Sequence, residues 1–141
     1  YGQDAVIGAL AEANPNLAVV FVSGNAVAMP WIDRVPAVLE AWYSGSEAGN
    51  ALADVLFGAV NPSGKLPFTF PVRLEDCSAH SAGEYPGEGQ VVYRDGIFVG
   101  YRWIEKERIE PLFAFGHGLS YTTFDIANVR ADRTSLGSLP T

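Results

Sequence analysis

An unbroken apolar run from Leu17 to Val22 is the feature that most constrains the fold of this chain. Such a run is typical of a strand covered on both faces, as in a parallel sheet that lies between helices. A second short apolar segment, Ala37 to Trp42, is interrupted only by Glu40. Segments with helical periodicity precede the first run and follow the second, so the order of elements predicts an α/β fold.

The two predicted helices span Gln3 to Ala13 and about Glu47 to Phe57. The first meets a stop signal at Asn14-Pro15, and in the second Ser46 can cap the start and Gly58 can end the helix. Apolar stripes are formed by Val6, Ile7 and Leu10 in the first helix and by Ala48, Leu52, Val55 and Leu56 in the second.

The second half of the chain has weaker periodicity. Leu66 to Phe70 alternates like a strand, although Pro67 restricts it to a sheet edge or a bulge. Residues 71–90 are mostly small or polar and predict a long surface loop. Residues 91–104 predict a hairpin around Asp95-Gly96, and residues 122–129 alternate like the first strand of a following unit.

Composition excludes several classes of function. The 141 residues are 48% hydrophobic, enough for a sizeable core, and the net charge of −7 disfavours nucleic acid as a partner. No apolar run approaches the roughly 18 residues of a membrane helix, and we expect no membrane partner. The single cysteine, Cys77, cannot form an internal disulfide, so it leaves the redox compartment undecided.

Motifs that would carry cofactor chemistry are absent from the sequence. His80 and His117 lack metal-ligand spacing, and one cysteine cannot complete a zinc set, so no metal is expected. The stretch from Gly45 to Gly49 misses the spacing of a serine nucleophile elbow by one residue. Ser23-Gly24-Asn25 has one glycine where a dinucleotide fingerprint needs three. We therefore expect no cofactor, and a nucleotide-binding protein ranks last among the alternatives.

Four stretches, in this order, resemble the second domain of the family 3 glycoside hydrolases. They are PAVLEAWY (36–43) leading into GNALADVLFG (49–58), NPSGKLPFTFP (61–71), YRDGIFVGYR (93–102) and FGHGLSYTTF (115–124). The resemblance covers about residues 3–124. It implies part of a doubly wound, flavodoxin-like α/β sandwich with a mostly parallel sheet. Residues 125–141 are then a linker or the start of a fibronectin-type-III-like β domain.

The resemblance also implies a two-domain enzyme whose reactive acids lie outside this chain. In the family, a barrel domain carries an aspartate nucleophile, and the acid/base glutamate precedes the helix that corresponds to Gln3 to Ala13. Glu88 lies between glycines, but its position before Tyr93 matches a noncatalytic loop of the family. We therefore assign no catalytic residue here. Tyr43, Glu47 and Asp95 are the residues expected near the substrate, although the first-turn position of Glu47 is also explained by the helix dipole alone.

By the same resemblance, the complete protein is a retaining β-glycosidase, with a β-glucosidase as the first expectation. Its substrates would be β-linked oligosaccharides or aryl and alkyl glucosides carrying a terminal non-reducing β-D-glucosyl unit. This chain would supply pocket walls and an interface with the barrel domain. The alternative is a noncatalytic carbohydrate-binding or interaction module that uses Tyr85, Tyr93 and Trp103. The family suggests secretion or a periplasmic location, but the residues themselves leave the compartment open, the cytoplasm included.

Overall fold

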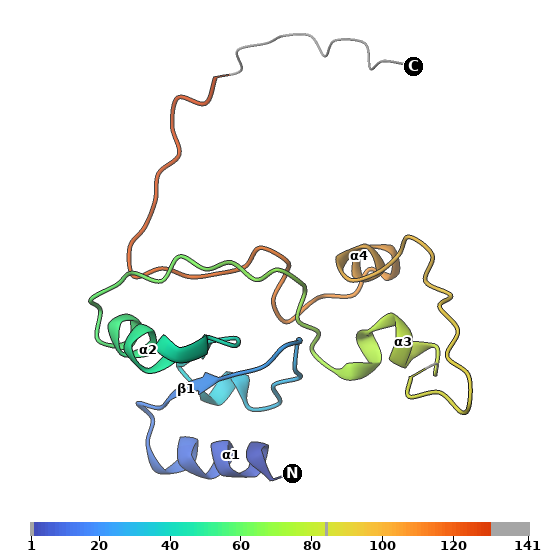
Figure 1. Ribbon diagram of the computed structural model, residues 1–141, viewed down its shortest axis with the longest axis horizontal. Helices are drawn as coiled ribbons and strands as arrows, with labels where there is room; N and C mark the ends of the chain where they lie inside the picture. The colour runs from blue at the N-terminus through green and yellow to red at the C-terminus, as the bar shows by residue number, and fades with distance from the viewer. Residues whose placement is uncertain (1, 84, 131–141) are drawn as a thin grey trace.

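The computed structural model describes residues 2–83 and 85–130, which form an α/β structure (Figure 1). Strands β1 (Ala18–Phe21) and β2 (Ala37–Glu40) pair in parallel, which confirms the predicted fold class. Within these ranges no helix has the length and apolar character needed to cross a membrane. The helices are α1 (Gln3–Ala13), α2 (Ala48–Leu56), α3 (Ser78–Ser81) and α4 (Tyr101–Glu107), and the 3-10 turns are η1 (Ile32–Arg34), η2 (Gly45–Glu47) and η3 (Leu74–Asp76).

The register of the two strands brings their carboxyl ends to the same level. Ala18 pairs with Ala37 at one end of the ladder, and Phe21 pairs with Glu40 at the other. The Phe21 carbonyl then accepts a hydrogen bond from the Ala41 N–H at 2.9 Å. The connections that follow β1 and β2 therefore leave the sheet side by side.

Helix α1 has the predicted bounds, and its packing face agrees with the predicted apolar stripe only in part. Ile7 and Ala11 pack against the core, whereas the side chains of Val6 and Leu10 are 59% and 49% exposed. At Gly8 an added Cβ would lie 3.0 Å from the Arg34 Nη2 atom, so the guanidinium packs closely against the helix there.

The ends of α2 agree only partly with the prediction. Ser46 lies inside η2 and does not cap the helix; Glu47 occupies the cap position, and its side chain makes no capping hydrogen bond to the helix backbone. At the other end, Gly58 has a φ of +80° and donates its N–H to the Val55 carbonyl, as expected of a terminating glycine. Leu56 and Phe57 remain exposed on this helix.

The core is centred on Phe70, whose side chain is 1% exposed. Its ring makes edge contacts with the rings of Phe21 and Phe113, at centroid distances of 6.4 and 6.3 Å, and it stacks on Phe68 at 5.7 Å. Met29, Trp31 and Val35 are buried in the same cluster. Phe70 therefore joins β1 to segments far along the chain.

No strand forms over Leu66 to Phe70, contrary to prediction. Instead, this segment runs antiparallel to residues 112–118 with irregular backbone bonds: the Leu66 N–H bonds the His117 carbonyl at 2.8 Å, and Phe70 and Phe113 form an isolated bridge. Pro67 and Pro71 interrupt the segment, and a proline cannot donate to a ladder. Figure 1 shows the two segments lying side by side above the sheet.

A second group of short helices, η3, α3 and α4, lies where a long loop and a hairpin were predicted, and both of these predictions are wrong. η3 and α3 fall within residues 71–90. Helix α4 begins at Tyr101, where the second strand of the hairpin was expected. Gly100 precedes α4 with a φ of +58°, and Arg108 ends it with a φ of +56°. These elements lie away from α1 and the sheet in Figure 1.

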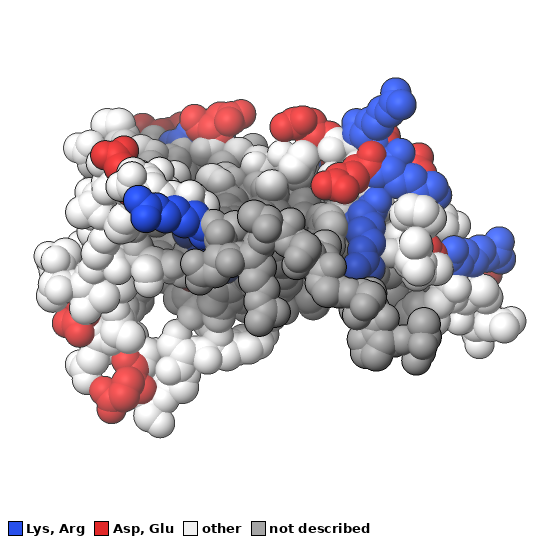
Figure 2. All heavy atoms as spheres, turned by 90° about the horizontal axis from the view of Figure 1, so that it is seen from above, with Lys and Arg blue, Asp and Glu red and all other residues white. Residues whose placement is uncertain are grey.

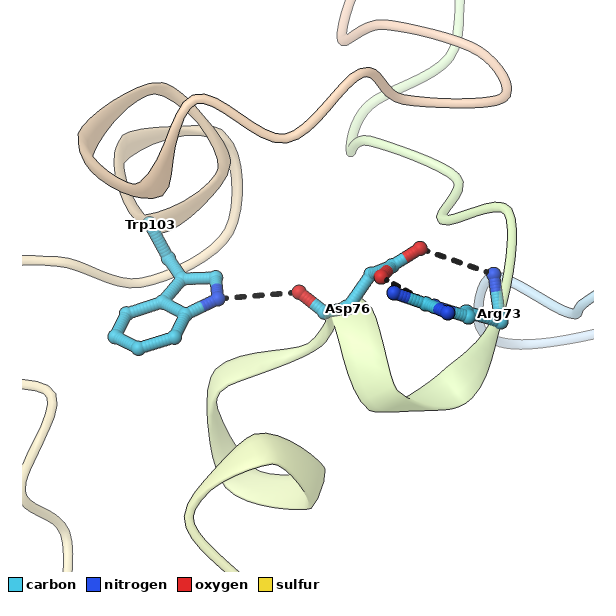
Figure 3. A network of polar contacts seen from close by, with 3 residues as sticks. All are labelled: Arg73, Asp76 and Trp103. Atoms are coloured by element: carbon cyan, nitrogen blue, oxygen red, sulfur yellow. Dashed lines mark hydrogen bonds and ion pairs between the residues drawn. The ribbon is translucent and has the colours of Figure 1, made fainter.

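Asp76 joins η3 to α4, as Figure 3 shows. Its buried carboxylate accepts bonds from the Arg73 Nε at 2.9 Å and the Arg73 backbone N–H at 3.2 Å. Its carbonyl accepts the Trp103 Nε1–H at 3.1 Å. The hydrogen bond with Asp76, and then its charge, raise the pKa of the Arg73 guanidinium. A local turn and a distant helix are thus fixed to one another by polar contacts.

Residues 122–130 contain no strand, so the strand predicted for 122–129 is not found there. They are exposed and run away from the rest of the chain in Figure 1. The rest of the predicted fibronectin-type-III-like segment, residues 131–141, lies outside the described residues. That domain, and the boundary after residue 124, therefore stay predictions.

Replacing Phe70 with alanine should lower the free energy of unfolding of the purified chain by about 3–5 kcal/mol, because the deletion leaves a cavity among several rings. The matched control is Phe57→Ala, since Phe57 is 90% exposed, and a surface change is expected to stay within about 0.5 kcal/mol. Urea titration followed by tryptophan fluorescence measures both. Equal losses in the two variants would contradict the central place of Phe70.

Cys77 should react with iodoacetamide at higher pH in the folded chain than in the urea-unfolded chain. Burial, and secondly the nearby Asp76 charge, raise the pKa of its thiol, and the thiolate is the reactive form. The folded state binds the thiol proton more tightly, so this contribution to stability is complete below the unfolded pKa and is lost as pH rises through the folded pKa. Cys77 is the sole cysteine, so mass spectrometry of alkylated chain follows one thiol. Identical pH profiles in the two states would contradict the burial of this side chain.

Candidate functional site

The candidate site is the carboxyl edge of the parallel sheet, where residues 22–25 follow β1 and residues 41–47 follow β2. Ligands of open α/β sheets bind in a crevice outside the carboxyl ends of the strands. Two of the three residues expected near the substrate, Tyr43 and Glu47, lie in the second connection.

Glu40, the last residue of β2, holds the two connections together. Its Oε1 accepts the Trp42 N–H at 2.8 Å and the Ser23 N–H at 3.3 Å, and its Oε2 lies 2.9 Å from the Ser23 hydroxyl. Sequence reasoning noted Glu40 only as an interruption of an apolar segment. That interruption was the available signal, since a carboxylate at the end of a half-buried strand needs polar partners.

Trp42 follows with backbone and ring both constrained. Its φ of +50° lies in the left-handed region, which non-glycine residues adopt at a cost of about 1–3 kcal/mol. The ring packs inward, with centroids 5.3 Å from Phe68 and 6.5 Å from Phe70. The hydrogen bond to Glu40 and these ring contacts together offset the backbone strain. They also fix the backbone position from which Tyr43 extends.

Tyr43 points outward and is 78% exposed. Its ring lies over Gly24, where an added Cβ would be 2.9 Å from Cε2 and 3.2 Å from the phenol oxygen. The two connections therefore touch through an aromatic ring placed against a bare backbone. The outer surface of this ring is available to a ligand.

Glu47 is exposed, and its Oε2 accepts a hydrogen bond from the Asn50 side chain at 2.7 Å. It shares the 41–47 connection with Tyr43. Asp95 lies elsewhere: its carbonyl accepts the Phe98 N–H at 2.9 Å, and the segment between α3 and α4 to which it belongs is far from β1 in Figure 1. The structure therefore groups Tyr43 and Glu47 and does not bring Asp95 to them.

An open groove of about 590 Å³ runs along the sheet. It is lined mainly by apolar side chains, among them Val20, Leu39, Leu56 and Leu119. Glu40 is the one carboxylate among its described lining residues. Because glycoside hydrolysis uses two carboxyl groups, this groove alone does not form a hydrolytic centre.

The aromatic side chains of the alternative binding module are not equivalent. Tyr85 and Tyr93 are exposed, at 61% and 89%. Trp103 is half-buried, donates its Nε1–H to Asp76, and has the Lys106 ammonium 5.2 Å from its ring. Trp103 thus holds α4 in place, and only the two tyrosines remain open to solvent.

Charges on the described surface are mixed rather than separated. Lysine and arginine side chains gather at one end of the face in Figure 2, with acidic side chains between them. Five of the nine lysine and arginine residues of the sequence, Arg73, Arg94, Arg102, Lys106 and Arg108, fall within residues 73–108. Over residues 2–83 and 85–130, no cluster of three or more His, Cys, Asp and Glu side chains could hold a metal ion.

Curated relatives of this chain are β-glucosidases. One from Bacteroides ovatus is 54% identical over 128 residues, which cover 89% of this chain and 17% of the relative. The thermostable β-glucosidase B of Acetivibrio thermocellus is 52% identical over 93% of this chain and 17% of its own length. The chain therefore spans about a sixth of the length of the curated relatives it matches.

Solved structures resemble the described fold closely. A β-glucosidase from Streptomyces venezuelae in complex with D-glucose superposes with a TM-score of 0.81 at 49% identity, over 87% of this chain and 16% of that one. A β-glucosidase from Kluyveromyces marxianus in complex with glucose has a TM-score of 0.82 at 44% identity, over 89% and 15%. The profile of the glycosyl hydrolase family 3 C-terminal domain matches residues 1–121. The chain therefore belongs to glycosyl hydrolase family 3, in which it corresponds to the C-terminal domain.

Proposed function

We propose that this chain is part of a retaining β-glucosidase that releases terminal, non-reducing β-D-glucosyl units from β-linked oligosaccharides or aryl and alkyl glucosides. The observation that carries the proposal is the 54% identity to a β-glucosidase over 89% of the chain. Two structural neighbours were also solved with glucose bound.

In this proposal the chemistry belongs to carboxylates outside the chain. A retaining enzyme needs a nucleophile and an acid/base about 5–5.5 Å apart. One acid attacks the anomeric carbon while the other protonates the leaving oxygen, and water then releases the sugar. Tyr43 and Glu47 contribute to the wall beside this centre, whereas Asp95 contributes to a different surface.

The exposed apolar groove favours the view that another part of the same enzyme packs against it. A two-stranded sheet is marginally stable by itself, and its outer edges offer unpaired backbone groups. Groove residues Leu56, Leu119 and Tyr121 are 45%, 78% and 60% exposed. We infer that the remaining C-terminal domain covers this groove and that the barrel domain lies beyond the carboxyl edge.

A noncatalytic carbohydrate-binding module is the second candidate, favoured by the exposure of Tyr85 and Tyr93. Calorimetry of the purified chain with glucan oligosaccharides separates the two. Saturable binding by the chain that is lost in Tyr93→Ala favours the module. Absence of binding favours the enzyme fragment.

Replacing the matching segment of the Bacteroides ovatus enzyme with residues 2–124 should yield a chimera that hydrolyses p-nitrophenyl β-D-glucoside. The 141-residue chain alone should show no turnover, because it lacks both reactive acids. A chromogenic assay of the two proteins, beside the unaltered enzyme, provides the measurement. Turnover by the chain alone, or a folded chimera without activity, would overturn the proposal.

Leu119→Asp should lower the midpoint of thermal unfolding of this chimera, because a carboxylate would be buried without a partner when the groove is covered. Leu119→Met is the matched control, since it keeps an apolar side chain of similar volume. Differential scanning fluorimetry measures both. If Leu119→Asp unfolds at the same temperature as the control, the groove is open to solvent in the whole enzyme.

A further inference from the structure

We propose that Glu40 is a positioning residue that fixes the Tyr43 ring as a rigid wall for the leaving group of the substrate. The inference rests on the proposed function, which it deepens by naming the residue that sets one wall of the site. It assigns Glu40 no contact with the sugar itself.

The geometry of the carboxylate carries the first step. Glu40 bonds Ser23 and Trp42, which are the immediate neighbours of Gly24 and Tyr43. Gly24 and Tyr43 are the two residues in contact across the edge. One carboxylate thus fixes the backbone on both sides of the contact between the tyrosine ring and the glycine.

The Ser23 hydroxyl contributes less to this arrangement than the two backbone N–H groups do. It lies 2.9 Å from Glu40 Oε2 and 2.7 Å from the Asn25 carbonyl, and its single proton serves one acceptor at a time. The Ser23 and Trp42 backbone N–H groups therefore make the hydrogen bonds to Glu40 that do not compete with another acceptor. Both of them bond the same oxygen, Oε1.

Trp42 transmits the constraint to Tyr43. Its left-handed backbone directs consecutive side chains to different surroundings, so that the Trp42 ring packs against Phe68 while Tyr43 remains exposed. Without the Glu40 acceptor, the Trp42 N–H would lose its partner and the left-handed backbone would lose one of its supports. The Tyr43 ring would then sample several positions.

A fixed, exposed ring at this edge suits recognition better than stability. Burial of Tyr43 contributes little, because 78% of the residue is exposed. A rigid aromatic side chain offers contact area at low entropic cost when a ligand binds. Its face matches the C–H surface of a pyranose ring or the face of an aryl group, which are the leaving groups of the proposed substrates.

The test uses the active chimera with p-nitrophenyl β-D-glucoside and cellobiose, and compares Glu40→Ala, Glu40→Gln and Tyr43→Ala. Tyr43→Ala and Glu40→Ala should each raise KM about three- to tenfold, the scale of one aromatic contact, with kcat within about twofold. Glu40→Gln keeps one acceptor oxygen for the two N–H groups and should recover most of the loss. Glu12→Ala, an exposed change on α1, is the control and should leave KM unaltered.

Two further variants separate positioning from general stability. The double variant Glu40→Ala/Tyr43→Ala should be no worse than Tyr43→Ala alone, because both changes remove the same wall. Gly24→Ala should raise KM while Glu40 is intact, because its Cβ displaces the ring. Effects of Glu40→Ala and Tyr43→Ala that multiply, or an unchanged KM in Glu40→Ala with only a lower unfolding temperature, would overturn the inference. An inactive chimera instead overturns the proposed function on which the inference rests.

Discussion

Burial of the Phe70 ring is the interaction on which the rest of this structure depends. Phe70 contacts Phe21 from β1, Trp42 from the connection after β2, and Phe113 from the returning segment. Its backbone also bonds Phe113 and Leu112. One side chain therefore determines how the sheet, its carboxyl edge and the distal segments meet, and the candidate site inherits its rigidity from that core.

The prediction from sequence succeeds where the signal is local and periodic. Residues 3–13 form the predicted helix because the run of helix formers ends at Asn14-Pro15, and the pairing of β1 with β2 follows from two apolar runs. Helix packing was harder to predict. Ile7 packs against the core as its stripe predicts, whereas Val6 and Leu10 stay exposed, because the part of a stripe that is covered depends on elements distant in the chain.

Failures of prediction share a physical cause, which is dependence on partners distant in the chain. Helix α4 is held by the bond from Trp103 to Asp76 and by Lys106 between the rings of Phe98 and Trp103. The aromatic and β-branched residues around Asp95-Gly96 predict a hairpin instead, because no local pattern encodes those contacts. The same holds for the site: the sequence identified Tyr43, but Glu40 becomes visible as its support only when residues 23 and 42 are brought together.

Two parts of the described surface, the apolar groove and the carboxyl edge of the sheet, differ in how well their own residues satisfy them. An apolar groove along two strands lowers the stability of the chain in water, since the hydrophobic effect favours covering it. The carboxyl edge, in contrast, is internally satisfied: Glu40, Ser23 and Trp42 use one another as partners. An edge organised by its own residues can keep its shape before a partner domain or a substrate arrives, and this preorganisation lowers the cost of binding. The groove is therefore a surface that a covering partner would stabilise, whereas the edge presents Tyr43 already in place.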